Sequence, residues 1–279
     1  MQGLPVTLED SIGDILRKAR LSGGMSVETA AGAAGLTEEA YSSMELSGQP
    51  APGTRFLPLG TALGLAGPRL QGLAQGWTPR SVDISAWREL RVITTEGDGM
   101  SVNCYLIWDE VTREAALFDT GFEATPIFAV IDTENLKLMH VFITHSHGDH
   151  VAALPSIRAR FPKVRLHTSS KHAPVEHRNR ATDFIMLGSL RITNRDTPGH
   201  AEDGVTYVVG NWPEDGSHVA VVGDAIFAGS MGGARDQLEL ARSKVREQIF
   251  SLPLPTLICP GHGPLTTVEE EKAHNPWFL

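Results

Sequence analysis

The 279-residue sequence predicts an α/β fold preceded by a small all-α domain. Apolar residues first recur at helical spacing. The pattern then changes to short runs rich in Val, Ile and Leu, separated by turn residues, which is typical of strands alternating with helices. Several of these runs end directly in His or Asp. We therefore predict a helical domain over 1–76, a linker over 77–88 and an α/β domain over 89–279.

Composition narrows the class of protein. The net charge is −9 and no basic block is present, which disfavours general binding to polyanions. Cys104 and Cys259 each lie in an apolar run, so we expect buried free thiols and a reducing compartment. The amino terminus lacks a basic start with an apolar core, and no apolar run is long enough to span a bilayer. These features predict a cytoplasmic protein without a membrane partner.

The amino-terminal domain is predicted to contain five short helices. Ile12, Ile15, Leu16 and Ala19 supply the apolar face of the first helix, which ends at the Gly23-Gly24 pair. Ser26 and Thr37 are good caps for the second and third helices. Two more short helices are expected at Phe56–Leu63 and Leu70–Ala74. A short helix, a glycine turn at Gly35 and a further helix match the helix-turn-helix arrangement.

Residues 8 to 75 resemble the phage-repressor type of helix-turn-helix domain. The resemblance is carried by Leu16-Arg17-Lys18-Ala19-Arg20, Met25-Ser26-Val27-Glu28, Ala34-Gly35-Leu36, Met44-Glu45, Leu59 and Ala62-Leu63-Gly64. It implies DNA as a partner. However, Glu38 and Glu39 stand at the exposed start of the third helix, and the segment has five basic and seven acidic residues. We therefore favour a domain retained for another purpose, such as forming a homo-oligomer or covering a catalytic pocket.

The α/β domain is predicted from runs that alternate in type. Strands are expected at Glu89–Thr94, Val102–Trp108, Ala115–Phe118, Leu138–Ile143, Val164–His167, Leu190–Ile192, Val205–Val209, Val219–Val222 and Thr256–Cys259. Helices are expected at Ala124–Asp132, Val151–Arg160 and about Gln237 to Phe250. The order predicts mixed sheets covered by helices.

A metal site is indicated by the run that follows Val141-Phe142-Ile143. Three imidazoles and a carboxylate, those of His145, His147, Asp149 and His150, are crowded into six residues. Neutral imidazole and carboxylate are ligands for zinc, iron and manganese. The alternating His145 and His147 side chains can reach one ion, whereas Asp149 and His150 follow a glycine and point towards a second.

Three later positions repeat the same design. His200 follows a Pro-Gly turn after a strand, Asp224 ends a strand, and His262 follows a strand and a glycine turn. Rigid strands can hold ligands at their ends, where loops cover them. This arrangement predicts that His200, Asp224 and His262 lie close to the run from His145 to His150, at one edge of the sheets.

Residues 89 to 279 resemble the metallo-β-lactamase superfamily, and within it the glyoxalase II group of hydroxyacylglutathione hydrolases. The matching motifs are Asp119-Thr120-Gly121, Thr144-His145-Ser146-His147-Gly148-Asp149-His150, Thr197-Pro198-Gly199-His200, Gly223-Asp224 and Pro260-Gly261-His262-Gly263-Pro264. The resemblance implies an αββα sandwich with two metals at the edge of two facing sheets. It assigns His145, His147 and His200 to one metal, Asp149, His150 and His262 to the other, and Asp224 to both. Asp119 would orient a ligand histidine, although it could equally be a residue that caps the end of a strand.

The predicted cofactors are two divalent ions, with zinc favoured and iron or manganese open, since His and Asp suit all three. Two such cations lower the pKa of a shared water from about 15.7 towards 7, so that a bridging hydroxide can attack a carbonyl. Asp149 and Asp224 are therefore the catalytic candidates. The predicted reaction is hydrolysis of a small-molecule thioester of the hydroxyacylglutathione type. Three alternatives are a lactone or ester hydrolase, a one-iron sulfur dioxygenase of the same fold, and a helix-turn-helix regulator with a metal-binding sensor domain.

Substrate contacts are less well indicated. Lys171 and Arg178 belong to a cation-rich segment over 170–180 that could bind an anionic group, or could be a solvated loop. Tyr207 and Lys272 are candidates through the resemblance to glutathione-binding members. Two departures argue against glutathione: the chain ends at Leu279 before any further helical domain, and Ala201-Glu202-Asp203-Gly204 places two acids after His200.

Overall fold

The computed structural model describes residues 7–213 and 216–279, so residues 1–6 of the predicted helical domain lie outside the described residues. The first five helices are α1 (Ile12–Ser22), α2 (Val27–Ala34), α3 (Glu38–Ser47), α4 (Phe56–Leu63) and α5 (Gly67–Ala74). We call these five helices the helical unit. The later helices are η1 (Ile84–Ala86), α6 (Thr125–Thr133), α7 (Gly148–Val151), α8 (Leu154–Arg160), η2 (Val175–His177), η4 (Arg235–Gln237), α9 (Leu238–Lys244), η5 (Val245–Ile249) and α10 (Val268–His274).

Two sheets form the centre of the molecule. The strands are β1 (Leu90–Gly97), β2 (Met100–Trp108), β3 (Glu114–Phe118), β4 (Lys137–Phe142), β5 (Arg165–His167), β6 (Phe184–Leu187), β7 (Leu190–Asp196), β8 (Val205–Gly210), β9 (Val219–Gly223), β10 (Leu257–Pro260) and β11 (Thr266–Thr267). One sheet has the order β1-β2-β3-β4-β5 and the other β11-β10-β9-β8-β7-β6. Within them, β3 pairs with β4 and β9 pairs with β10 in parallel. Such mixed sheets agree with the predicted α/β class.

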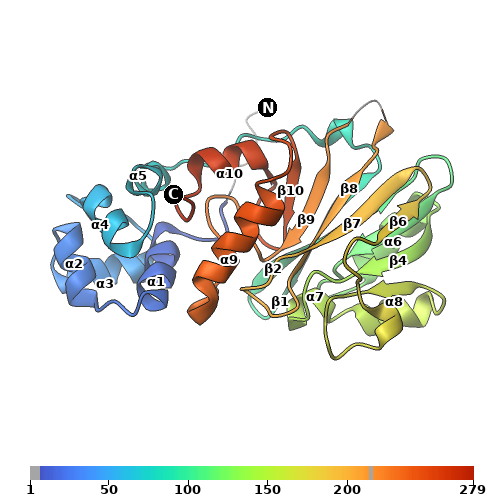
Figure 1. Cartoon of the computed structure of the whole chain (residues 1–279), viewed down its shortest axis with the longest axis horizontal. Coiled ribbons are helices and arrows are strands. Elements are labelled where there is room, and N and C mark those ends of the chain that lie inside the picture. The colour runs from blue at the N-terminus through green and yellow to red at the C-terminus, as the bar shows by residue number, and fades with distance from the viewer. Residues whose placement is uncertain (1–6, 214–215) are drawn as a thin grey trace.

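The side chains of the strands alternate between two layers of core. Phe118, Phe142 and Tyr207 belong to the cluster between the two sheets, and Phe118 stacks on Phe142 with ring centroids 5.0 Å apart. On the far side of the first sheet, α6 and α8 pack through a second cluster that includes Ile127 and Ile157. Helices α9 and α10 cover the second sheet (Figure 1). The result is the predicted αββα sandwich.

The helical unit forms because each turn in it has the residue its geometry needs. The side chains of Ser26 and Thr37 accept hydrogen bonds from the backbone N–H groups of Thr29 and Ala40, which caps α2 and α3 as expected. Gly35 takes a left-handed conformation between them. The sequence therefore places these helices correctly, while a helix-turn-helix identity for them stays a prediction.

The helical unit is joined to the α/β part rather than set apart from it. Figure 1 shows it at one end of the molecule, beside α9, α10 and the carboxyl terminus. Leu16 and Leu59 share one hydrophobic cluster with Ile226 and Trp277, and the Ala66 N–H donates to the carbonyl of Pro276 at 2.7 Å. Burial of one such side chain contributes about 2 kcal/mol, so the shared core holds the two parts together. The predicted boundaries at 76 and 89 stay a prediction.

The sequence missed or misjudged a few elements. The short strands β6 and β11 were not predicted, and the predicted helix 151–160 is instead two helices, α7 and α8. The predicted strand 89–94 runs on to Gly97 as β1, because it pairs with β2 along its whole length. Both cysteines are buried and free, as expected, and burial raises the pKa of each thiol. Among the described residues, no helix is long and apolar enough to cross a membrane.

A buried acid on α10 leads to a prediction about stability. The Glu271 side chain accepts hydrogen bonds from the Thr266 hydroxyl (2.8 Å), the Gly229 N–H (3.0 Å) and the Asn275 amide (2.8 Å). Burial nevertheless outweighs these bonds and raises the pKa of Glu271 from its ordinary value of 4.5 to about 7. The folded state therefore holds this proton more tightly than the unfolded state does.

Glu271→Gln is expected to remove a pH-dependent loss of stability. The contribution of protonated Glu271 is complete below pH 4.5 and is lost as the pH rises through about 7. The free energy of unfolding of wild-type protein should therefore fall by roughly 3 kcal/mol relative to that of the variant over this pH range. The measurement is the free energy of unfolding in urea between pH 4.5 and 8, with exposed Glu269→Gln as the control for loss of one charge. An unchanged difference across that range would contradict the expectation.

Candidate metal centre

The metal-ligand residues meet because the strands before them end at the same edge. Parallel neighbours β3 and β4 end at Phe118 and Phe142, while parallel β9 and β10 end at Gly223 and Pro260. Asp119, His145, Asp224 and His262 follow these ends within three residues. His200 lies in the turn between β7 and β8. The strand-end arrangement inferred from the sequence is therefore present in the fold.

A first group consists of three imidazoles that converge on one point. The His147 Nδ1 atom lies 3.1 Å from His145 Nε2 and 3.0 Å from His200 Nε2. The other ring nitrogens are already engaged, since His200 Nδ1 lies 3.0 Å from the Gly233 carbonyl and His145 Nδ1 lies 3.1 Å from the Thr144 hydroxyl. Neutral rings oriented by these bonds direct the lone pairs of both Nε2 atoms inward. A single proton on His147 cannot satisfy both of them, whereas a cation would.

A second group combines Asp149, His150 and His262, whose ligand atoms lie within 4.8 Å of one another. His262 Nε2 lies 3.1 Å from Asp149 Oδ2, and His150 Nε2 lies 3.5 Å from the same oxygen. His262 Nδ1 donates to the Ser101 carbonyl at 2.6 Å, which turns its Nε2 towards the group.

Asp224 lies between the two groups. One carboxylate oxygen is 3.4 Å from His150 Nε2, and the other is 3.4 Å from His200 Nε2 and 3.5 Å from His262 Nε2. The side chain is almost fully buried. A carboxylate so placed can contact an ion in either group, which is the role predicted for it.

Two buried side-chain atoms that lack a hydrogen-bond partner support metal binding at this centre. Within 7–213 and 216–279, His150 Nε2 and Asp224 Oδ1 are fully buried and have no hydrogen-bond partner. Leaving such groups unpaired is costly in free energy. Both point into the space between the ligand groups, so the residues fit a pair of divalent ions there.

The raised pKa values of two histidines also support metal binding at this centre. Although burial lowers it, the pKa of His150 rises to about 10 because of the Asp119 and Asp224 carboxylates. The neighbouring Asp149 and Asp224 likewise raise the pKa of His262 to about 11 against the effect of burial. The carboxylates thus stabilise the positively charged form of both imidazoles. A bound metal would supply this positive charge in place of the protons.

Asp119 makes contacts that suit both roles considered from the sequence. At the end of β3 its Oδ1 accepts from the Thr144 N–H at 2.7 Å, which stabilises the start of the ligand run. Its Oδ2 accepts from the Thr144 hydroxyl at 2.7 Å and lies 2.8 Å from His150 Nδ1. Asp119 is almost completely buried. It therefore fixes the His150 ring with Nε2 facing the second group.

Asp119→Asn is expected to weaken metal binding by about 10- to 100-fold, because a neutral amide has a single accepting oxygen and cannot accept on both sides from Thr144 and His150. The measurement is competition for zinc with a chromophoric chelator. Affinity within about twofold of wild type would show that the carboxylate is not needed to orient His150.

A cleft of about 850 Å³ opens beside the first group. His147 and His200 form one wall, while Arg235 and Leu240 contribute a cation and an apolar surface to another. Its volume lies in the range of small-molecule sites. The sequence did not single out Arg235 or Leu240; the glycines at 232 and 233 after Asp224 were the available signal for a loop at the site.

The predicted substrate contacts lie elsewhere. Of the described residues that line the cleft, none is Lys171, Arg178, Tyr207 or Lys272. Lys171 forms an exposed ion pair with Glu202, which does line the cleft, and the Lys272 ammonium lies 3.5 Å from the Phe250 carbonyl. Their role in binding substrate stays a prediction that the geometry does not favour.

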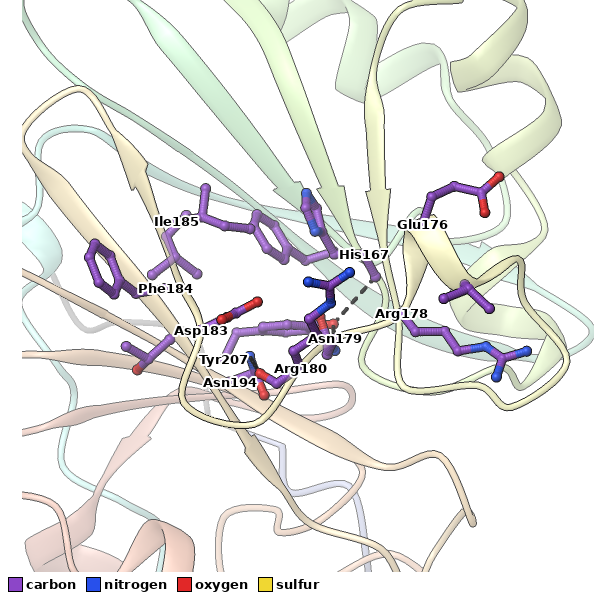
Figure 2. A pocket seen from close by; sticks show the side chains of 14 residues that line it. His167, Glu176, Arg178, Asn179, Arg180, Asp183, Phe184, Ile185, Asn194 and Tyr207 are labelled. Atoms are coloured by element: carbon purple, nitrogen blue, oxygen red, sulfur yellow. Dashed lines mark hydrogen bonds between the residues drawn. The ribbon is translucent and has the colours of Figure 1, made fainter.

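Tyr207 and Arg178 instead line a separate cavity of about 230 Å³ near the edges of the two sheets (Figure 2). The Tyr207 hydroxyl accepts from the Asn179 amide at 2.8 Å and lies 3.1 Å from the Ile143 carbonyl. Arg178 is directed away from Tyr207 and donates to the Ala173 carbonyl. Tyr207 thus supports the strand that leads to the ligand run.

Comparison with known proteins places these observations in a family. The family described as "Metallo-beta-lactamase superfamily" matches residues 97–270. Human mitochondrial persulfide dioxygenase ETHE1 is 32% identical over 181 residues, covering 62% of this chain and 69% of that protein. Hydroxyacylglutathione hydrolase GloC of Haemophilus influenzae is 26% identical over 201 residues, covering 63% and 92%. The crystal structure of ETHE1 from Myxococcus xanthus superposes with a TM-score of 0.58 at 29% identity, covering 67% and 83%.

Proposed function

The chain belongs to the metallo-β-lactamase superfamily, and from that premise we propose that it is a two-metal hydrolase that cleaves a small-molecule thioester of the hydroxyacylglutathione type. The observation that carries the proposal is the second ligand group. Asp149, His150 and His262 are all present and oriented, and the buried Asp224 lies between them and the first group. The relative GloC is named for hydrolysis of hydroxyacylglutathione.

The ions held here would supply hydroxide at neutral pH and polarise a substrate carbonyl. Asp224, whose two oxygens lie near histidines of both groups, would help to hold both ions. Asp149 is less buried than Asp224, and it can accept a hydrogen bond from the attacking water and hold its proton. Attack adds oxygen to the carbonyl carbon, and the carbon–sulfur bond then breaks to release a carboxylic acid and a thiol. Since a thiolate leaves readily, the residues need not include a strong acid.

The wall of the cleft bears on the substrate. Arg235 is exposed and lines the cleft with His200, so it could attract an anionic substituent of the acyl group or the thiol. Glu202 and Asp236 also line the cleft and would repel additional carboxylates. These charges favour a small substrate with one anionic group over glutathione itself, which has two carboxylates.

A second candidate is a dioxygenase that oxidises a persulfide using one iron. The observation in its favour is the greater identity to human ETHE1, 32% over 181 residues against 26% over 201 residues for GloC. His147, His200 and Asp224 would still be present for a single ion. We do not propose DNA recognition, because exposed Glu38 and Glu39 stand at the start of α3.

The two candidates are separated by assays on protein of known metal content. Protein loaded with zinc, iron or manganese is assayed on thioesters, esters and lactones, and separately for oxygen uptake with a glutathione persulfide. Thioester turnover with near two equivalents of metal supports the hydrolase. Persulfide-dependent oxygen uptake with one iron would replace it with the dioxygenase, and inactivity on all the thioesters would refute the proposed thioester reaction.

A further inference from the structure

The amino-terminal segment contacts the loop that begins at Asp224. We call residues 224–233 the ligand loop. Asp10 Oδ2 accepts from the Ser230 hydroxyl at 2.5 Å and from the Lys18 ammonium at 2.6 Å. The Lys18 ammonium also donates to the Met231 carbonyl at 3.2 Å. Asp10 is 7% exposed and Ser230 is fully buried, so their bond is shielded from water, while Lys18 is partly exposed.

The ligand loop affects both metal-ligand groups. It starts with the Asp224 carboxylate, and it is closed by a bond from the Gly232 N–H to the Asp224 carbonyl at 3.2 Å. At its far end, the Gly233 carbonyl lies 3.0 Å from His200 Nδ1 and sets the orientation of that ring. A shift of the ligand loop would therefore move the carboxylate between the ions and turn one imidazole.

A second contact reaches the loop that carries His262. Gly263 has a φ of +73°, and a Cβ there would lie 3.1 Å from both the backbone nitrogen and the Cβ of Glu9. The chain at Glu9 thus rests directly on the residue after a predicted ligand. One short segment, Glu9–Asp10, therefore contacts both the ligand loop that begins with Asp224 and the loop that carries His262.

The carboxyl-terminal residues hold the ligand loop from its other side. The Ser230 hydroxyl lies 3.2 Å from Trp277 Nε1, and the Asn275 amide donates to the Ser230 carbonyl at 2.7 Å. Since the Asn275 bond to the Ser230 carbonyl involves neither Asp10 nor Lys18, their loss should displace the loop without unfolding it. Removing either Asp10 or Lys18 leaves the other without its charged partner, which costs free energy. A shift of the ligand loop that lets the unpaired group find another partner is therefore the expected response.

We propose that Asp10 and Lys18 are positioning residues of the metal centre, which hold the ligand loop so that Asp224 and His200 bind metal tightly. The start of the chain, through Asp10 and through Lys18 of α1, then sets the metal affinity of the catalytic domain, and this would be a use for the helical unit other than reading DNA. The inference rests on the proposed metal centre.

The test uses full-length Asp10→Asn, Lys18→Met and Ser230→Ala variants. Ser230→Ala removes the Asp10 link from the side of the ligand loop, together with the Trp277 bond to the same hydroxyl, and keeps the test decisive if a charge variant does not fold. For each variant, the affinities of both ions are measured by zinc competition with a chelator, and the absorption spectrum is recorded with cobalt. We expect about 10- to 100-fold weaker binding of at least one ion, with an altered cobalt spectrum.

The matched control is Arg20→Met. Arg20 forms a partly buried bidentate pair with Glu45 inside the helical unit, at 2.7 and 2.8 Å, and among the described residues it makes no hydrogen bond to the ligand loop. This variant should lose stability while keeping its metal affinity within about twofold. Rescue by Lys18→Arg, which keeps the charge, would further support a positioning role.

Each other outcome overturns the inference in a recognisable way. Unchanged affinity and cobalt spectra in the Asp10, Lys18 and Ser230 variants would refute it while leaving the metal centre intact. If Arg20→Met lost as much metal affinity as these variants, and the loss followed the loss of stability, the contact of Asp10 and Lys18 with the ligand loop would have only a structural role. Wild-type protein that binds no metal would instead refute the proposed function on which the inference rests.

Discussion

Asp224→Ala is expected to lower turnover by at least about 1000-fold, or roughly 4 kcal/mol in the activation free energy. The reason is that a single side chain lies within 3.5 Å of imidazoles from both ligand groups. Its removal leaves His150 and His262 without the carboxylate that stabilises positive charge beside them. Metal content should fall from near two equivalents to one or fewer, measured by elemental analysis after gel filtration.

Asp224→Asn provides the comparison, because it keeps the volume and one oxygen but loses the charge. It should retain more metal than the alanine variant and still turn over slowly. Two equivalents of metal and unchanged thioester turnover in Asp224→Ala would rule out a shared carboxylate at this position.

Gly261→Ala is expected to exclude metal by occupying its site. A Cβ at position 261 would lie 2.2 Å from Asp224 Oδ1 and 2.7 Å from His150 Cε1, which is closer than any real contact. Because the added methyl group presses on two ligand side chains, metal affinity should fall by at least about 100-fold, the upper end of the range for residues that only orient ligands. Fold stability should fall by about 1 to 3 kcal/mol, as for other overpacked sites.

A second glycine supplies the control. Gly148 lies within the His-rich run itself, yet a Cβ there meets no atom within 4 Å. Gly148→Ala should therefore bind metal as wild type does, and both variants can be compared by chelator competition and thermal unfolding. Similar metal affinity in the two variants would show that the space beside Asp224 is not where metal binds.

Several candidate metal ligands could be brought together from the sequence because His145, Asp224 and His262 follow apolar strands within three residues. Local residue type decides where such a strand ends, so His145, Asp224 and His262 could be placed at one edge before any contact was known. The carbonyls that orient the histidines could not be found in this way. Every residue has a carbonyl, and only the fold shows that those of Ser101 and Gly233 face His262 and His200.

Long-range packing explains the remaining differences. The exposed residues of strand β6, Phe184 and Met186, are apolar like the rest of the strand. Its sequence therefore lacks the alternation of apolar and polar residues that marks a half-buried strand. Pairing with β7 makes the segment extended. Tyr207 was chosen as a substrate contact from a resemblance, but in the fold its hydroxyl is buried between strands. Contacts between residues such as Asp10 and Ser230, 220 positions apart, leave no local pattern.

The order of synthesis has a consequence for the core that the helical unit shares with the carboxyl-terminal residues. Leu16 and Leu59 leave the ribosome well before their cluster partners Trp277 and Phe278, which follow Leu59 in the sequence by about 220 residues. At about 5 to 20 residues per second, the first helices wait roughly 10 to 40 s for those partners. During that interval their apolar faces are open to solvent and to other nascent chains. Expression at lower temperature, or with a chaperone that shields apolar helices, should therefore raise the yield of native protein.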